Sequence, residues 1–128
     1  MTGRKRYNMK HLVASTAKVE KRIDMVKVER MTGVSITDKA MTTVAVDTID
    51  TVSNMYVFDV ETEEGTITQA IIATDDIAYS TCSAIAVDLI RELIQLVNKG
   101  EVSLSEIGFN VNITVSKAGN KYLDLQLM

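Results

Sequence analysis

The residues best suited to binding chemistry stand near the end of the chain, around Tyr122. This tyrosine follows Lys121, and Lys117 precedes both across a predicted turn. An aromatic ring offers a face on which a nucleic-acid base can stack, and a nearby lysine offers a charge for the phosphate. One such stack contributes about 1–3 kcal/mol with little dependence on the base. The same tyrosine could instead stabilise a hairpin as one member of a cross-strand pair.

Other aromatic and basic side chains extend the list of candidates. Tyr56 and Phe58 share one face of a predicted strand and could also stack bases, although Val60 lies on that face and core packing would explain at least one of them. Tyr79 precedes a predicted helix, where it could stack or act as a hydrophobic staple. Candidates for phosphate contacts come from the basic first third of the chain: Lys21, Arg22, Lys27 and Arg30.

Charge is distributed unevenly along the 128 residues, although the net charge is only −3. Residues 1–33 hold nine Lys/Arg and three Asp/Glu, whereas residues 34–128 hold five Lys/Arg and fourteen Asp/Glu. This asymmetry indicates a polyanion-binding end joined to an acidic body. We expect the folded domain to gather its positive charge, with Lys121 and Tyr122, on one face. The negative charge is expected in turns and on the outer face of a helix.

The inventory of reactive residues argues against an enzyme. One cysteine and one histidine are too few for an internal disulfide, a CxxC pair or a histidine-based metal centre. Cys82 falls in a predicted helical stripe, where it would be a small buried hydrophobe. The acids at 61–64 and 75–76 are typical of a solvated turn and of the approach to a helix. No glycine-rich phosphate loop precedes a helix. We therefore expect no catalytic residue, no metal and no cofactor.

Length and composition are those of one globular domain, with 46% apolar and 24% charged residues. We expect residues 1–10 to form a flexible basic arm, which could be no more than a soluble charged end, and residues 11–128 to form a single domain. No apolar stretch is long enough to span a bilayer, and the N-terminus lacks the apolar core of a secretory signal. The sequence therefore predicts no membrane partner and a reducing cytoplasm.

Alternation of apolar and polar residues predicts strands over much of the chain. The segment 11–31 fits either a helix or a long strand with a bulge near 25–26, and its many β-branched residues favour the strand. Further strands are predicted at Thr42–Val52, Met55–Glu61 and Thr66–Thr74, with a hairpin turn at Thr62–Gly65.

One helix and a final hairpin have the clearest patterns. Residues 80–99 carry an apolar stripe at helical spacing, with Ser80 or Thr81 as a cap and Gly100 after the end. Residues 109–127 alternate strictly around a turn. Three strand regions, one helix and two strands match the order of an OB-fold, whose barrel binds oligonucleotides. We expect an α+β, mostly β fold: an OB-like five-stranded barrel with one helix between the third and fourth strands.

The second half of the chain, residues 66–127, resembles the small single-stranded-DNA-binding (SSB) proteins of bacteriophages. The resemblance lies in the strand TITQAIIATDD, the helix of IAYSTCSAIAVDLIRELIQLV and the closing hairpin NVNITVSKAGNKYLDLQL. It implies an OB-like fold, non-catalytic coating of single strands in phage replication or recombination, and stacking by tyrosines. By position it points first to Tyr122 and Lys121, then to Tyr79. The chain lacks Trp and the long acid-tipped tail of cellular members, so recruitment of enzymes by such a tail is not expected.

The leading hypothesis is sequence-independent binding of single-stranded DNA, by aromatic stacking and neutralisation of phosphates. The resemblance implies phage replication proteins and a second copy of the chain as further partners, in the cytoplasm of a bacterial host. The alternative is a small oligomeric phage protein that binds a host protein or a small ligand, which an acidic body suits equally. Titration with oligo(dT) at two salt concentrations separates them, because phosphate contacts weaken steeply with salt.

Overall fold

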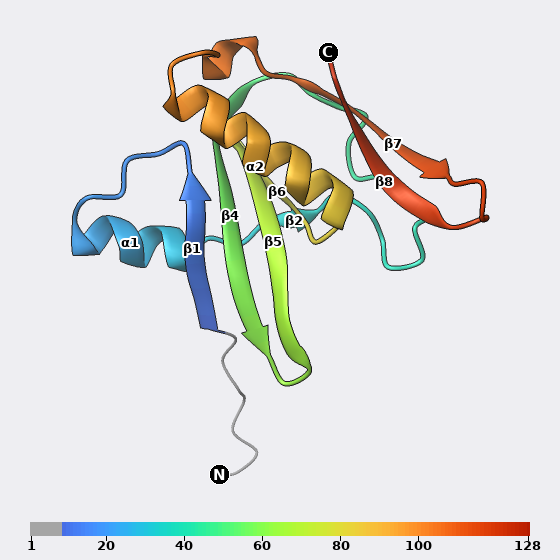
Figure 1. Cartoon of the computed structure of the whole chain (residues 1–128), viewed down its shortest axis with the longest axis horizontal. Coiled ribbons are helices and arrows are strands. Elements are labelled where there is room, and N and C mark those ends of the chain that lie inside the picture. The colour runs from blue at the N-terminus through green and yellow to red at the C-terminus, as the bar shows by residue number, and fades with distance from the viewer. Residues whose placement is uncertain (1–8) are drawn as a thin grey trace.

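The computed structural model describes residues 9–128, which form an α+β fold that is mostly β, with two helices and two open sheets (Figure 1). The expected class is confirmed, but these residues form no closed five-stranded barrel. Of the expected flexible arm, residues 1–8 lie outside the described residues, and Met9 and Lys10 already belong to a strand. The elements follow in chain order: β1 Met9–Ser15, α1 Arg22–Glu29, β2 Val34–Ser35, β3 Thr48–Ile49, β4 Val52–Thr62, β5 Gly65–Thr74, β6 Ala78–Thr81, α2 Ala84–Asn98, a 3-10 helix Leu104–Glu106, β7 Phe109–Val115 and β8 Lys121–Leu127.

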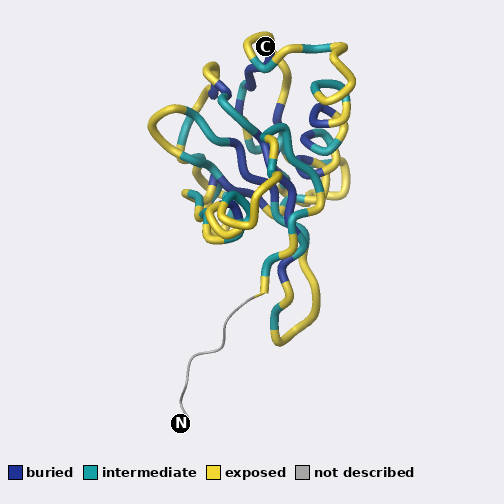
Figure 2. Tube along the Cα trace, turned by 90° about the vertical axis from the view of Figure 1, so that its left-hand side faces the viewer, coloured by how far each residue is buried: buried dark blue, intermediate teal, exposed yellow. Residues whose placement is uncertain are grey.

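The larger sheet has the strand order β1-β4-β5-β6-β2, antiparallel except for the β2–β6 pair. Its central hairpin, β4–β5, turns at Thr62–Gly65 as predicted, where Gly65 adopts a φ of 125° that other residues rarely tolerate. The Thr62 hydroxyl donates to the Gly65 carbonyl at 2.7 Å and closes the turn. Figure 2 shows that this end of the hairpin is exposed and projects from the body of the domain.

The smaller sheet has the order β3-β7-β8 and contains the predicted C-terminal hairpin. Phe109 and Val111 on β7 and Leu123 and Leu125 on β8 are buried, whereas the residues between them face away from the core. The alternation of apolar and polar residues along these two strands therefore indicates a sheet with one covered face. Gly119, with a φ of 87°, supplies the left-handed residue of the turn.

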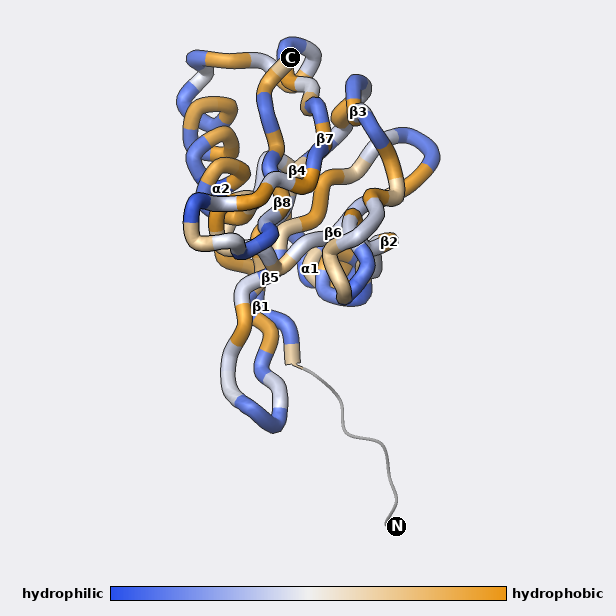
Figure 3. The backbone as a smooth tube through the Cα atoms, turned by 90° about the vertical axis from the view of Figure 1, so that its right-hand side faces the viewer, coloured by the Kyte–Doolittle hydropathy of each residue, from blue (hydrophilic) through white to orange (hydrophobic). Residues whose placement is uncertain are grey.

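Helix α2 begins at Ala84, later than the sequence pattern predicts. Neither Ser80 nor Thr81 caps it, because both belong to β6 and pair with β5. The predicted end is confirmed: Lys99 is the C-cap, and Gly100 follows with a φ of 79°. Hydrophobic and hydrophilic residues alternate around the helix in Figure 3, as expected for one buried stripe.

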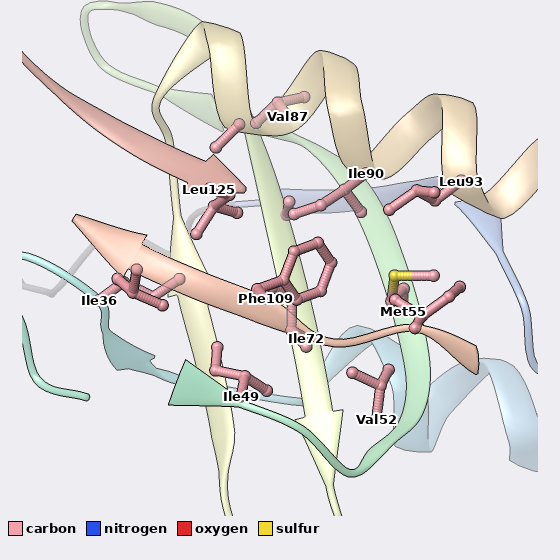
Figure 4. Packing of buried hydrophobic residues seen from close by; sticks show 14 of the residues in the cluster. Ile36, Ile49, Val52, Met55, Ile72, Val87, Ile90, Leu93, Phe109 and Leu125 are labelled. Carbon is pink, nitrogen blue, oxygen red and sulfur yellow. The ribbon is translucent and has the colours of Figure 1, made fainter. Parts of the chain in front are cut away.

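The main core lies where one face of the larger sheet meets α2 and the smaller sheet (Figure 4). Helix α2 contacts β4, β5 and β8, so it joins the two sheets. The largest side chains with almost no exposed surface in this cluster come from the larger sheet, the loop after β2, α2 and the smaller sheet: Ile36, Met55, Ile72, Ile90, Ile94, Phe109 and Leu123.

A second, smaller core lies on the opposite face of the larger sheet. Tyr56, Phe58 and Val60 of β4 pack there with Ile71 of β5, and Val28 of α1 covers them. Tyr56, Phe58 and Val60 thus share one face of β4 as predicted, and both faces of this strand are covered. The larger sheet is the middle layer of the domain.

The strand favoured for residues 11–31 is confirmed only at its start, up to Ser15, and is wrong for the rest of that segment. The chain ends β1 at Ser15 and forms α1 at Arg22–Glu29, where the Lys21 amide donates to the Asp24 carboxylate at 3.2 Å. Val28 is the only buried residue of this short helix, so the helix shows little apolar periodicity. The strand irregularity lies instead at Leu12–Ala14 of β1.

The predicted strand at Thr42–Val52 is also mostly wrong, since only Thr48–Ile49 and Val52 pair within sheets. The preceding segment is a loop organised around Asp38. Its carboxylate accepts the backbone amides of Thr42 and Thr43 at 2.7 and 2.9 Å and the Thr42 hydroxyl at 2.6 Å. These local bonds satisfy donors that a strand would have given to a neighbour.

Candidate nucleic-acid interface

A groove of about 610 Å³ is lined by residues of both sheets. Its walls come from four separate parts of the chain: the end of β2 with the loop after it, Gln69 of β5, the end of β6 with the residues before α2, and the start of β8. Tyr122 and Lys121 line it from β8, and Lys39 lines it from the loop. The structure therefore brings the two best-supported candidates together with a second lysine.

The position of Tyr122 follows from the packing of its strand. Leu123 is buried in the main core, so its neighbour Tyr122 must point to the other side of β8. There Tyr122 is half-buried opposite Thr114 of β7. The tyrosine is thus a cross-strand partner and part of the groove wall at once, and the two interpretations of this residue are compatible.

The two lysines give the groove its positive charge. Lys39 and Lys121 are exposed, and neither forms an ion pair with any other residue in the range 9–128. Asp38 also lines the groove, but its oxygens accept three hydrogen bonds from its own loop. The Thr42 hydroxyl and the Thr42 and Thr43 amides lower the pKa of Asp38 to about 2. Its carboxylate therefore holds the loop that presents Lys39.

Several groove residues have hydroxyl or amide groups that can contact a polar ligand. Ser80, Thr81 and Ser83 lie at the β6 end, and Gln69 lies on β5. The sequence pattern missed these residues and Lys39, because serines and a loop lysine carry no periodic signal. Nothing in the spacing of Asp38 and Lys39 indicates that their loop meets β8.

Cys82 also lines the groove, which corrects its expected place in the stripe of the helix. It is exposed, because α2 begins two residues later. Partial burial by the surrounding protein raises the pKa of its thiol, and the nearby Lys10 charge opposes that effect.

Tyr56 and Phe58 cannot stack bases in this fold, contrary to the prediction. They are 5% and 0% exposed in the second core, with ring centroids 6.2 Å apart. Lys10 extends over the Phe58 ring, its Nζ 5.1 Å from the centroid, and donates to the Met31 carbonyl. The alternative interpretation of these two aromatics, core packing, is confirmed for both.

Tyr79 and Lys117 lie away from the groove. Tyr79 is half-buried against the main core and lines a different pocket, of about 440 Å³, together with Asp50 and Asp76. Tyr79 lies within β6, five residues before the first residue of α2, so it is not the hydrophobic staple of that helix. Lys117 is exposed in the β7–β8 turn and does not line the groove.

The basic residues of α1 belong to another layer. All four candidates are exposed, but α1 packs on the face of the larger sheet opposite to α2 and the smaller sheet. In Figure 1, α1 lies at the left and the β7–β8 turn at the right. The expectation that these cations share one face with Tyr122 is therefore wrong for this group: Lys21, Arg22, Lys27 and Arg30.

Residues 9–128 contain no group of three or more His, Cys, Asp or Glu side chains placed to hold a metal ion. The same residues include no helix with the length and hydropathy needed to cross a membrane.

Comparison with known proteins identifies no relative of this chain: no family model, no curated protein and no solved structure matches it.

Proposed function

We propose that this protein binds single-stranded DNA without sequence preference, with Tyr122 stacking a base and Lys39 and Lys121 contacting phosphates. The observation that carries the proposal is the groove that unites these three residues from β8 and the loop after β2. An aromatic surface with flanking cations is the common basis of sequence-tolerant single-strand binding. The role would be non-enzymatic, as a coat on single strands in phage replication or recombination.

The order of elements gives further support. A β4–β5–β6 meander, helix α2 and the β7–β8 hairpin follow one another as in the OB-fold. The resemblance of residues 66–127 to phage SSB proteins covers these elements from β5 onward. We infer an opened, OB-like arrangement in which the groove lies between the two sheets. The proposal includes homo-oligomers and phage replication proteins as partners in a bacterial cytoplasm.

A small ligand is the second candidate, because the volume of the groove lies within the usual range for small-molecule pockets. Such a ligand would be anionic and would contact the same lysines. It would bind as a compact unit, without dependence on oligonucleotide length.

The test is a titration of fluorescent oligo(dT) followed by polarisation at low and high salt. We expect binding at low salt that weakens steeply as salt rises, because phosphate contacts release counterions. Tyr122→Leu should lower the affinity by about 1–3 kcal/mol, the usual contribution of one base stack.

The matched control is Tyr79→Leu, which removes an aromatic ring from outside the groove. The affinity of Tyr79→Leu for oligo(dT) should equal that of the unmodified protein. Circular dichroism checks that Tyr79→Leu and Tyr122→Leu are both folded. The absence of any polarisation change with oligo(dT) at low salt would refute the proposal. Equal losses of affinity in Tyr122→Leu and Tyr79→Leu would show that Tyr122 does not contact the DNA.

A further inference from the structure

A second pocket adjoins the groove at Cys82. It has a volume of about 330 Å³, and its walls come from β5 and the first half of α2, including Asp88 and Arg91. Cys82 lines both cavities, so they meet at this exposed residue. A ligand leaving the groove past Cys82 would therefore reach Arg91.

Cations are concentrated along this path. Outside the basic first third, the chain has five Lys/Arg and fourteen Asp/Glu. Three of those five cations, Lys39, Lys121 and Arg91, line the two cavities, against two of the fourteen acids, Asp38 and Asp88. An acidic body that places most of its remaining cations along one path favours a polyanion there.

Each cavity is also lined by a residue with one buried polar atom that has no hydrogen-bond partner within residues 9–128. These atoms are the Gln69 side-chain oxygen at the groove and the Arg91 Nε at the second pocket. Buried polar atoms in folded proteins are normally paired, so an unpaired one needs an explanation. These two atoms are themselves covered, so each side chain must move for the atom to reach a ligand. A side-chain amide oxygen then accepts from the N–H of a base, and a guanidinium donates well to phosphate.

We propose that a single strand stacked on Tyr122 continues past Gln69 and over Cys82, and places a backbone phosphate at Arg91. This inference rests on the proposed function and deepens it, since it gives the bound strand a path and assigns Arg91 to the phosphate contacts. It also makes Cys82, the only cysteine of the chain, a residue covered by bound DNA.

The first experiment measures alkylation of Cys82 by N-ethylmaleimide, with and without saturating oligo(dT). The reaction is run at mildly alkaline pH, because partial burial raises the pKa of the thiol. An uncharged reagent avoids repulsion by the DNA. We expect alkylation to slow in proportion to the fraction of protein bound and nearly to stop at saturation.

The second experiment compares Arg91→Ala with Lys99→Ala. Both residues belong to the α2 segment and each variant loses one positive charge, but Lys99 is the C-cap and lines neither cavity. Loss of one phosphate contact to a single strand should reduce the slope of log affinity against log salt by about 0.7 for Arg91→Ala. Lys99→Ala should keep the original slope. Thermal unfolding confirms that each variant is folded.

The outcomes separate this inference from the proposed function. If oligo(dT) binds but Cys82 reacts at an unchanged rate, the path is wrong and single-strand binding at Tyr122 still stands. Equal salt slopes for Arg91→Ala and Lys99→Ala likewise overturn the role of Arg91. If no oligo(dT) binds at low salt, the proposed function is wrong, and this inference is wrong as well. The alkylation experiment uses the unmodified chain, so it still tests the path of the strand if Arg91→Ala does not fold.

Discussion

Strands β4 and β8 both carry aromatic residues on one face, and the fold gives these aromatics opposite environments. Tyr56 and Phe58 on β4 are buried beneath α1, whereas Tyr122 on β8 remains half-exposed in a groove. The difference lies in the neighbours of each strand. β4 is interior to the larger sheet and has a layer on each side, whereas β8 is an edge strand with its core on one side only. Alternation shows which residues share a face, and the tertiary packing shows whether that face is open.

The same contrast applies to the cations. The basic first third supplies most of the positive charge, but α1 displays its share on the far side of the larger sheet from the smaller sheet. The groove receives Lys39 and Lys121 from the acidic remainder of the chain. Net charge along the sequence is therefore a poor guide to the local charge of a site.

The largest expected effect comes from removing a covered aromatic. Phe58→Ala should lower the free energy of unfolding by about 3–5 kcal/mol, because it leaves a cavity in the second core and removes the ring beneath Lys10. Urea unfolding followed by circular dichroism measures this.

The matched substitution on the open strand is Tyr122→Ala. This substitution should lower the free energy of unfolding by no more than about 1 kcal/mol, which is the usual contribution of a cross-strand pair. Similar losses in the two variants would contradict the difference between a covered and an open face.

An intermediate effect should distinguish the two groups of cations. Lys121→Ala should reduce the slope of log affinity for oligo(dT) against log salt by about 0.7, because it removes one phosphate contact. Arg22→Ala removes the same charge from α1 and should leave the slope unchanged. A larger change of this slope for Arg22→Ala than for Lys121→Ala would show that DNA binds at α1 and not in the groove.

The smallest effect concerns the loop that presents Lys39. Hydrogen bonds from Thr42 and Thr43 lower the pKa of Asp38 from 3.8 to about 2. Its stabilising effect on the loop is therefore complete above the ordinary value of 3.8 and is lost as the pH falls towards about 2. The Thr42 and Thr43 amide signals in NMR spectra should titrate over that window, and in Asp38→Asn they should not. A titration that persists in Asp38→Asn would show that another group controls the loop.

Much of the fold could be predicted because its signals are local. The β4–β5 turn, the β7–β8 hairpin and the end of α2 each depend on residues adjacent in sequence, such as Gly65, Gly119 and Gly100. Residues 18–31 could not be assigned in this way. Val28 is the only buried residue of helix α1, so the sequence lacks the apolar stripe that identifies a helix. The β-branched residues of this segment favour a strand instead.

The candidate site was predicted in part for the same reason. Tyr122 and Lys121 were found because a strand and its turn are visible in the sequence. Lys39, Gln69 and Arg91 were missed, because they meet these residues only through contacts between separate segments.

By itself, the sequence determined the class of the fold, the face on which each hairpin residue lies, and a lysine–tyrosine pair suited to stacking. These are consequences of backbone periodicity and of the conformations that glycine permits. Only the tertiary structure decided which faces are covered, where the cations gather and that Cys82 stands at the meeting of two cavities. Those properties depend on how layers pack, and burial removes a side chain from any ligand regardless of its chemical type.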